Sequence, residues 1–122
     1  MAAGMQVIVH ADNPISTITQ VMVQDVFFGK TTRWSDGTNV VAIDQLEKSA
    51  VRDEFSQKVL KKRVDAVKSF WLAKIFSGRG TPPVEHKSDA AVIEAVRTQR
   101  GAIGYVAADA VLGAGVKAIT VK

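Results

Sequence analysis

The stretch Gly101-Ala102-Ile103-Gly104-Tyr105-Val106 closes a series of glycine and aromatic residues that runs through most of the chain. The series begins at Phe27-Phe28-Gly29-Lys30 and continues through Arg33-Trp34-Ser35-Asp36-Gly37 and through residues 76–83, which read Phe-Ser-Gly-Arg-Gly-Thr-Pro-Pro. Glycine admits positive φ and close backbone approach, and a neighbouring aromatic ring supplies buried apolar area. The series therefore predicts sharp turns against buried rings, which informs about the fold more than about chemistry.

Length and composition indicate one domain. The chain has 122 residues, of which 47% are hydrophobic and 23% charged, as in an ordinary globular protein. A domain of this size buries about two thirds of the surface that its unfolded chain exposes. No apolar run approaches the roughly 20 residues that span a bilayer. The chain has no cysteine, which excludes disulfides, thiolate metal sites and a cysteine nucleophile.

The charge balance favours acidic ligands only weakly. Sixteen basic and 12 acidic residues give a net charge of +4, but most of the excess is dispersed along the chain. The one dense run, Lys58 with residues 61–63, is followed by Asp65 and is interpreted as a solvated helix end. Because no aromatic residues alternate with these cations, we do not expect nucleic-acid binding.

Hydrophobic periodicity predicts an α/β chain in which strands alternate with helices. Strands are expected at 6–10, 40–43, 102–106 and 116–121, and helices at 17–28, from Ser49, over the apolar stripe Val64, Val67, Trp71 and Ile75, and after Ser88. The first helix is expected to open with a capping box at 17–20. Its buried face is expected to carry Ile18, Val21, Met22 and Phe28. Such an alternation predicts a sheet with helices on its faces.

Several of these residues, taken in order, resemble a known family. They are Phe28-Gly29-Lys30, Arg33-Trp34, Asp36-Gly37, Ser49, Arg52, Phe55, Phe70-Trp71, Phe76, Gly78, Gly80 and residues 101–106. The set resembles phosphate ABC transporter substrate-binding proteins, and more closely their short single-lobe, PstS-like relatives, over roughly residues 6–110. The resemblance implies a three-layer single lobe of the type II periplasmic-binding-protein fold, with a small, mixed, mostly parallel sheet and helices on both faces.

The same resemblance implies the domain organisation and location. Residues 1–122 are expected to form one lobe, with 1–5 as a processed or replaced N-terminal segment. This N-terminus lacks the basic region and apolar core of a secretory signal, although the family implies a periplasmic or extracytoplasmic location. The family also implies a membrane transporter component as a partner.

The resemblance also implies a ligand site at a helix N-terminus. In full-length phosphate binders, a Ser-Gly-Thr turn donates hydrogen bonds to the anion, and a helix N-terminus suits this role through its free amides and its dipole. The matching turn here is Ser49-Ala50-Val51, and Gln45 replaces the arginine that those proteins carry four residues before the serine. Arg52, in the first helical turn, is the substitute cation. We therefore expect Ser49, Ala50, Val51 and Arg52 to bind phosphate or another small anion.

Two plainer interpretations of these residues remain open. Ser49 is also an ordinary helix N-cap, and Arg52 is also a common kind of salt-bridging residue. Each lost donor to an ion removes about 1.5–3 kcal/mol, so the departures from the family pattern weaken the predicted site.

The alternative function is a protein-interaction or self-associating module that has kept the lobe and lost the solute site. Homodimerisation is then expected, because a lone lobe has no opposing lobe to cover it.

The sequence does not predict an enzyme. Its two histidines, His10 and His86, have no second ligand at metal-binding spacing, so neither a metal site nor a cofactor is expected. Asp12 and Ser16 lie near His10 in sequence, but sequence proximity does not make a catalytic triad.

Overall fold

The computed structural model describes residues 4–122, so the first three residues of the expected N-terminal segment 1–5 lie outside the described part. The elements in chain order are β1 (Met5–His10), β2 (Thr17–Ile18), α1 (Gln20–Phe27), β3 (Val41–Gln45), α2 (Ala50–Phe55), the π-helical turn η1 (Ser56–Leu60), α3 (Val64–Phe76), β4 (Val84–His86), α4 (Asp89–Thr98), β5 (Ala102–Ala107) and β6 (Val116–Val121). Within 4–122, no helix is both long and apolar enough to cross a membrane.

The strands form one six-stranded sheet in the order β2-β6-β1-β5-β3-β4. Strand β1 runs antiparallel to both of its neighbours, β5 and β6. The other pairings, β2 with β6, β3 with β5 and β3 with β4, are parallel. The expectation of a mixed, mostly parallel sheet is therefore confirmed.

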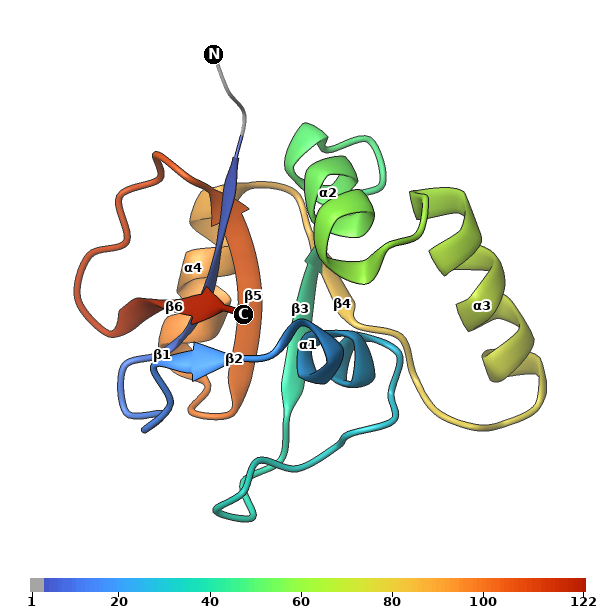
Figure 1. The fold of residues 1–122 in the computed structure, drawn as a ribbon, viewed down its shortest axis with the longest axis horizontal. Coiled ribbons are helices and arrows are strands. Elements are labelled where there is room, and N and C mark those ends of the chain that lie inside the picture. The colour runs from blue at the N-terminus through green and yellow to red at the C-terminus, as the bar shows by residue number, and fades with distance from the viewer. Residues whose placement is uncertain (1–3) are drawn as a thin grey trace.

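Helices cover both faces of the sheet, as Figure 1 shows, with α4 on one side of β1 and β5 and the other helices on the opposite side. The core under α4 joins Val92 and Val96 to Ile8, Ile43 and Val106 of the strands. The larger core, on the other face, includes Phe27, Phe55, Val67, Trp71, Ile103 and Tyr105. Two cores separated by one sheet make a three-layer α/β fold, as expected.

The start of α1 differs from the sequence prediction. Thr17 and Ile18 form β2 and pair with Thr120 and Val121, so a sheet ladder takes the residues that were expected to open the helix. The helix begins after Thr19, whose hydroxyl accepts a hydrogen bond from the Met22 amide at 3.0 Å. This shift also corrects part of the predicted apolar face, although Ile18 and Phe28 are buried as expected. Val23, Val26 and Phe27 are buried, whereas Val21 and Met22 are exposed.

The third helix and the strand after it also differ from the prediction. Val67 and Trp71 are buried as expected, but Ile75 is 46% exposed because the last turn of α3 extends beyond the core. Residues 84–86 were not predicted as a strand, yet they pair in parallel with residues 43–45 at the edge of the sheet. This strand has only three residues and follows two prolines, so it is too short to show the alternation of apolar and polar residues that predicts a strand.

Part of the glycine and aromatic series packs as the sequence predicts, whereas Phe76 is 88% exposed and no atom lies within 4 Å of a Cβ placed on Gly78 or Gly80. A Cβ on Gly101 would overlap the carbonyl oxygen of Asn39, and the Gly101 carbonyl accepts a hydrogen bond from the Trp34 indole at 2.9 Å. The Tyr105 ring stacks on Phe55, with ring centroids 3.9 Å apart. Strand β5 therefore lies at the centre of both cores with Gly101 directly before it, and this position makes the segment 101–106 decisive for the fold.

Candidate functional site

Ser49 lies just before α2 and caps it. Its hydroxyl accepts a hydrogen bond from the Arg52 amide at 3.2 Å and donates one to Oε1 of Gln45 at 3.1 Å. The Ser49 carbonyl accepts from the Asp53 amide, which starts the helical ladder. The hydroxyl therefore already has an intramolecular acceptor for its proton.

The next two residues, Ala50 and Val51, present backbone donors. A helix leaves its first amides without intrahelical acceptors, and no other acceptor for these two is found among residues 4–122. They lie beside a cavity of about 230 Å³ that is lined by Gly4, Ala50, Val51, Glu54, Ala107, Ala108 and Asp109. Residues 107–109 end β5 and follow it, so the cavity lies at the carboxyl ends of the parallel strands, where α/β sheets commonly bind ligands.

Arg52, the expected cation of the site, is buried and already paired. Its Nη1 donates to Oε2 of Glu85 at 2.8 Å and to the Gln45 carbonyl at 3.0 Å, and its Nε lies 3.6 Å from Oδ1 of Asp44. Only 4% of the residue is exposed. Although burial opposes the charge, these two carboxylates raise the pKa of Arg52, so the guanidinium stays charged. The structure thus joins Arg52 to two acidic groups, Asp44 and Glu85, that no sequence motif connects with it.

A buried hydrogen-bond network connects Asp44 to Tyr105. The Tyr105 hydroxyl donates to Oδ1 of Asp44 and accepts from the Gln45 amide at 3.2 Å. Burial raises the pKa of Asp44, although the Arg52 charge and the Tyr105 hydroxyl partly offset this effect. Burial and the nearby Asp44 charge raise the pKa of Tyr105, which stays protonated and donates.

Gln45 links this network to the start of α2. Its side-chain amide donates to Oδ1 of Asp89 at 2.8 Å and to the Tyr105 carbonyl at 3.0 Å, while its Oε1 accepts from Ser49. Where the resemblance implies an arginine, Gln45 therefore holds a neutral side chain whose amide nitrogen and oxygen both have hydrogen-bond partners. One signal could have found the network: Asp44 and Gln45 end a strand whose preceding residues are apolar.

The charges around the helix start limit its chemistry. The cavity beside Ala50 is lined by two carboxylates, Glu54 and Asp109, and by no basic side chain. Free amides stabilise an anion, whereas these carboxylates repel one unless it carries a proton that it can donate to them. The arrangement therefore suits weak binding of a partly protonated oxyanion.

The described histidines do not belong to a metal-binding cluster. No group of three or more His, Cys, Asp or Glu side chains within 4–122 could hold a metal ion. Nδ1 of His10 accepts a hydrogen bond from the Asp12 amide at 3.0 Å, which fixes the turn after β1.

Comparison with known proteins identifies the fold. No family model matches the sequence, and no curated protein does. The structure resembles a phosphate ABC transporter substrate-binding protein with bound phosphate from Clostridium perfringens, with a TM-score of 0.77 and 22% identity. It also resembles an ABC-type phosphate transport receptor from Vibrio cholerae (TM-score 0.77, 17% identity) and PstS from Borrelia burgdorferi (TM-score 0.68, 15% identity).

These matches cover 98% of this chain but only 45%, 46% and 47% of the respective solved chains. The chain thus spans just under half the length of those proteins. The expected resemblance to phosphate ABC transporter substrate-binding proteins is confirmed at the level of the fold. At such low identities the likeness shows the architecture alone. The ligand and any partner of this chain depend on the residues of its own site.

Proposed function

We propose that this chain is a non-enzymatic solute-binding lobe that holds phosphate, or a similar small oxyanion, at residues 49–52. The observation that carries the proposal is the pair of backbone amides of Ala50 and Val51. Both lack an acceptor among the described residues, and both lie beside a cavity at the carboxyl ends of β3 and β5. Amides at a helix N-terminus bind anions through hydrogen bonds and the helix dipole.

In this proposal Ser49 and Arg52 support the site more than they contact the ligand. Ser49 fixes the start of the helix through its cap, and Arg52 anchors the first turn to β3 and β4 through Asp44 and Glu85. The anion therefore receives backbone donors and no free guanidinium. We expect weak binding, with a dissociation constant on the order of 1 mM, because only a few exposed contacts contribute.

The carboxylates of the cavity provide a test of selectivity. Hydrogen phosphate keeps an O–H that can donate to Glu54 or Asp109, whereas sulfate at neutral pH has no proton to donate. Phosphate should therefore bind more tightly than sulfate at equal ionic strength. Equal affinities would indicate simple attraction of any anion to the net positive charge.

The sharpest variant removes one donor and keeps the helix. Ala50 is the first residue of α2, a position where proline is tolerated because its missing N–H has no intrahelical partner. We expect Ala50→Pro to weaken phosphate binding about tenfold, as measured by titration calorimetry or by NMR, since a donor to a charged group is worth about 1.5–3 kcal/mol.

The matched control is Val64→Pro, which makes the same change at the first residue of α3. It should leave phosphate affinity unchanged. If both variants bind phosphate as the unaltered protein does, the amides of α2 are not the site, and the proposal fails.

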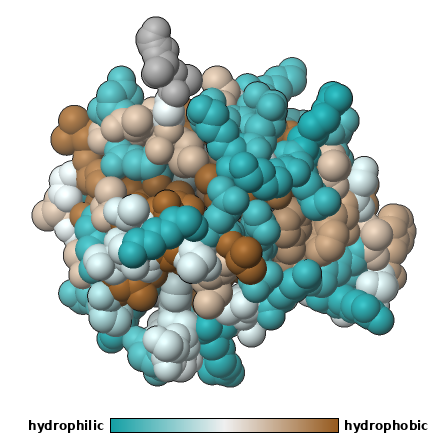
Figure 2. Space-filling model, viewed as in Figure 1, coloured by the Kyte–Doolittle hydropathy of each residue, from teal (hydrophilic) through white to brown (hydrophobic). Residues whose placement is uncertain are grey.

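The second candidate function is a self-associating module, and a specific surface favours it. Leu72, Ile75 and Phe76 of α3 are 56%, 46% and 88% exposed, and we call these three residues the α3 apolar surface. Figure 2 shows light-brown residues among hydrophilic ones where α3 lies. Val84 on the neighbouring edge strand is 57% exposed as well. Adjacent exposed apolar side chains of this kind mark interaction surfaces.

Sedimentation equilibrium tests this candidate directly. If two chains associate through the α3 apolar surface, Leu72→Glu should shift the protein toward monomer. Val111→Glu is the control, because Val111 is 89% exposed on the loop between β5 and β6. A protein that is monomeric before any substitution would eliminate the candidate.

The cellular setting follows from the proposed function. An extracytoplasmic location and a membrane transporter component as partner are extended to this chain from the resemblance. Both belong to the solute-binding proposal and would be abandoned with it.

A further inference from the structure

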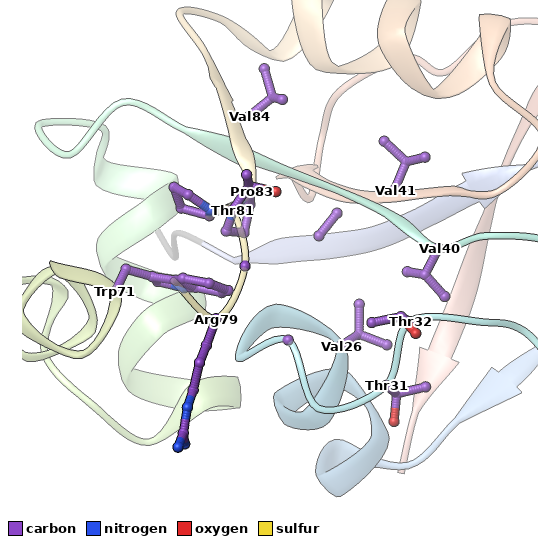
Figure 3. A pocket seen from close by; sticks show the side chains of 14 residues that line it. Val26, Thr31, Thr32, Val40, Val41, Trp71, Arg79, Thr81, Pro83 and Val84 are labelled. Carbon is purple, nitrogen blue, oxygen red and sulfur yellow. The ribbon is translucent and has the colours of Figure 1, made fainter. Parts of the chain in front are cut away.

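A cavity lies at the opposite end of β3 from Ser49. It has a volume of about 330 Å³, near the lower end of the range for small-ligand sites. Figure 3 shows Val26, Thr31 and Thr32 on one side of it and Trp71, Thr81 and Pro83 on the other. Its floor is the first part of β3, with Val40, Val41 and Ala42. No residue of this cavity belongs to the proposed anion site.

The floor of the cavity offers an unpaired backbone donor. The Val41 amide donates to the Gly101 carbonyl at 2.9 Å, so it faces β5. Because neighbouring residues of a strand point their amides to opposite sides, the Ala42 N–H faces the β4 side. Strand β4 begins only at Val84, opposite Ile43, and no acceptor for the Ala42 amide is found within 4–122.

The walls and the mouth of the cavity add two further properties. The walls are mostly apolar, with valine, proline and Trp71 side chains. The one charged residue that lines the cavity is Arg79, and no carboxylate lines it. Arg79 extends away from β3, as Figure 3 shows, and no ion pair of Arg79 is found in the described chain. An anionic group at the mouth would thus meet a cation with no competing acid in the lining.

We propose that this cavity binds the carboxyl-terminal end of a short, extended, apolar peptide. A peptide carbonyl accepts the Ala42 N–H and continues the sheet beside β3, which is the geometry of strand addition. The apolar side chains lie against Val26, Val40 and Trp71, and the terminal carboxylate faces Arg79. A simple aliphatic acid fits less well, since its single polar group cannot reach the amide on the floor and the cation at the mouth together.

The proposal is tested with acetyl-Val-Ala-Val bearing a free carboxyl group and with its carboxamide. Titration of the ¹⁵N-labelled full chain with the acid should shift the Ala42 amide resonance in a saturable manner. The acid should bind about two- to fivefold more tightly than the carboxamide, the range expected for one exposed ion pair. In Arg79→Gln the two peptides should bind equally, while Arg63→Gln, the same change at another exposed arginine, should preserve the difference.

Three results would overturn the proposal. They are an Ala42 resonance that does not respond at about 10 mM peptide, equal binding of acid and carboxamide to the unaltered protein, and hexanoate binding as tightly as the peptide acid. Arg79→Gln should leave phosphate binding at Ala50 unchanged, so the outcome is independent of the anion site.

Discussion

Arg52 and Arg79 lie near opposite ends of the same part of the sheet, and their surroundings differ in every respect. Arg52 is buried, and its guanidinium contacts Asp44, Glu85 and the Gln45 carbonyl. Arg79 is exposed, lines the cavity beside the start of β3 and has no ion pair within the described chain. Position in sequence favours Arg52 as an anion ligand because it follows a helix N-cap, but its environment makes it part of the scaffold.

Burial decides whether a cation is available to a ligand. A buried guanidinium loses its hydration and must be compensated by fixed acceptors, which in turn occupy its donors. An exposed one retains its donors and adds little to stability. If this holds, substitutions around Arg52 should lower the free energy of unfolding, whereas substitutions at Arg79 should not.

The largest effect is expected for Arg52→Ala. This change leaves Asp44 buried without its cation, so the free energy of unfolding should fall by about 3 kcal/mol, the lower part of the range for a broken buried pair because Glu85 is partly exposed. Urea denaturation measures it. Arg79→Ala is the comparison and should change stability by less than about 0.5 kcal/mol. A loss below about 1 kcal/mol for Arg52→Ala would show that the buried ion pairs of Arg52 do not hold the fold together.

Tyr105→Phe should cost less, about 2 kcal/mol in the free energy of unfolding. The ring and its stacking on Phe55 are retained, but Asp44 loses the hydroxyl that donates to it and the Gln45 amide loses an acceptor. Chemical denaturation monitored by circular dichroism gives the value. Phe55→Leu separates the two roles, since it removes the stacking and keeps the hydroxyl network. An unchanged stability in Tyr105→Phe would show that the network contributes nothing.

Ser49→Ala removes a helix cap and should cost about 1 kcal/mol. Ser88→Ala, which removes the equivalent cap of α4, should cost a similar amount. The two variants are distinguished by phosphate affinity, which should fall only in Ser49→Ala, because the loosened first turn no longer holds the Ala50 and Val51 amides in place. Equal phosphate affinities in both variants would count against a role of the cap in binding.

The smallest effect concerns the pH dependence due to Asp44. Burial raises the pKa of Asp44 above its ordinary value of 3.8, so the folded state binds this proton more tightly than the unfolded state. The stabilising contribution is therefore complete below pH 3.8 and is lost as the pH rises through the folded-state pKa. Asp44→Asn removes this dependence.

The measurement is the difference in free energy of unfolding between the unaltered protein and Asp44→Asn across the acid range. It should fall with rising pH, because the folded state then loses a proton that it binds more tightly than the unfolded state. Other carboxylates, such as Asp36 with its lowered pKa, occur in both proteins and cancel in the difference. If the difference increases with pH instead, the Arg52 charge lowers the pKa of Asp44 by more than burial raises it.

The sequence predicts much of the fold because its strongest signals are local. Ser49 and Ser88 cap helices as expected, and the apolar runs at 6–10 and 102–106 are strands. The errors arise where distant pairing decides the structure. Thr17 and Ile18 look helical in isolation, but strand β6, a hundred residues later, takes them into the sheet.

The candidate site was only partly predictable for the same reason. The cap at Ser49 and the free amides of Ala50 and Val51 follow from helix chemistry. The partners of Arg52 do not, because Glu85 reaches it only through the parallel pairing of β3 with β4. The Ala42 donor likewise depends on where β4 begins, which no local pattern indicates.

The most direct test of the solute-binding account is a phosphate titration of the ¹⁵N-labelled chain at constant ionic strength, with sulfate and chloride as references. The account predicts saturable shifts of the Ala50 and Val51 amides with phosphate, weaker ones with sulfate, and none with chloride. Uniform, non-saturating shifts, or saturable shifts confined to residues outside 49–52, would contradict it.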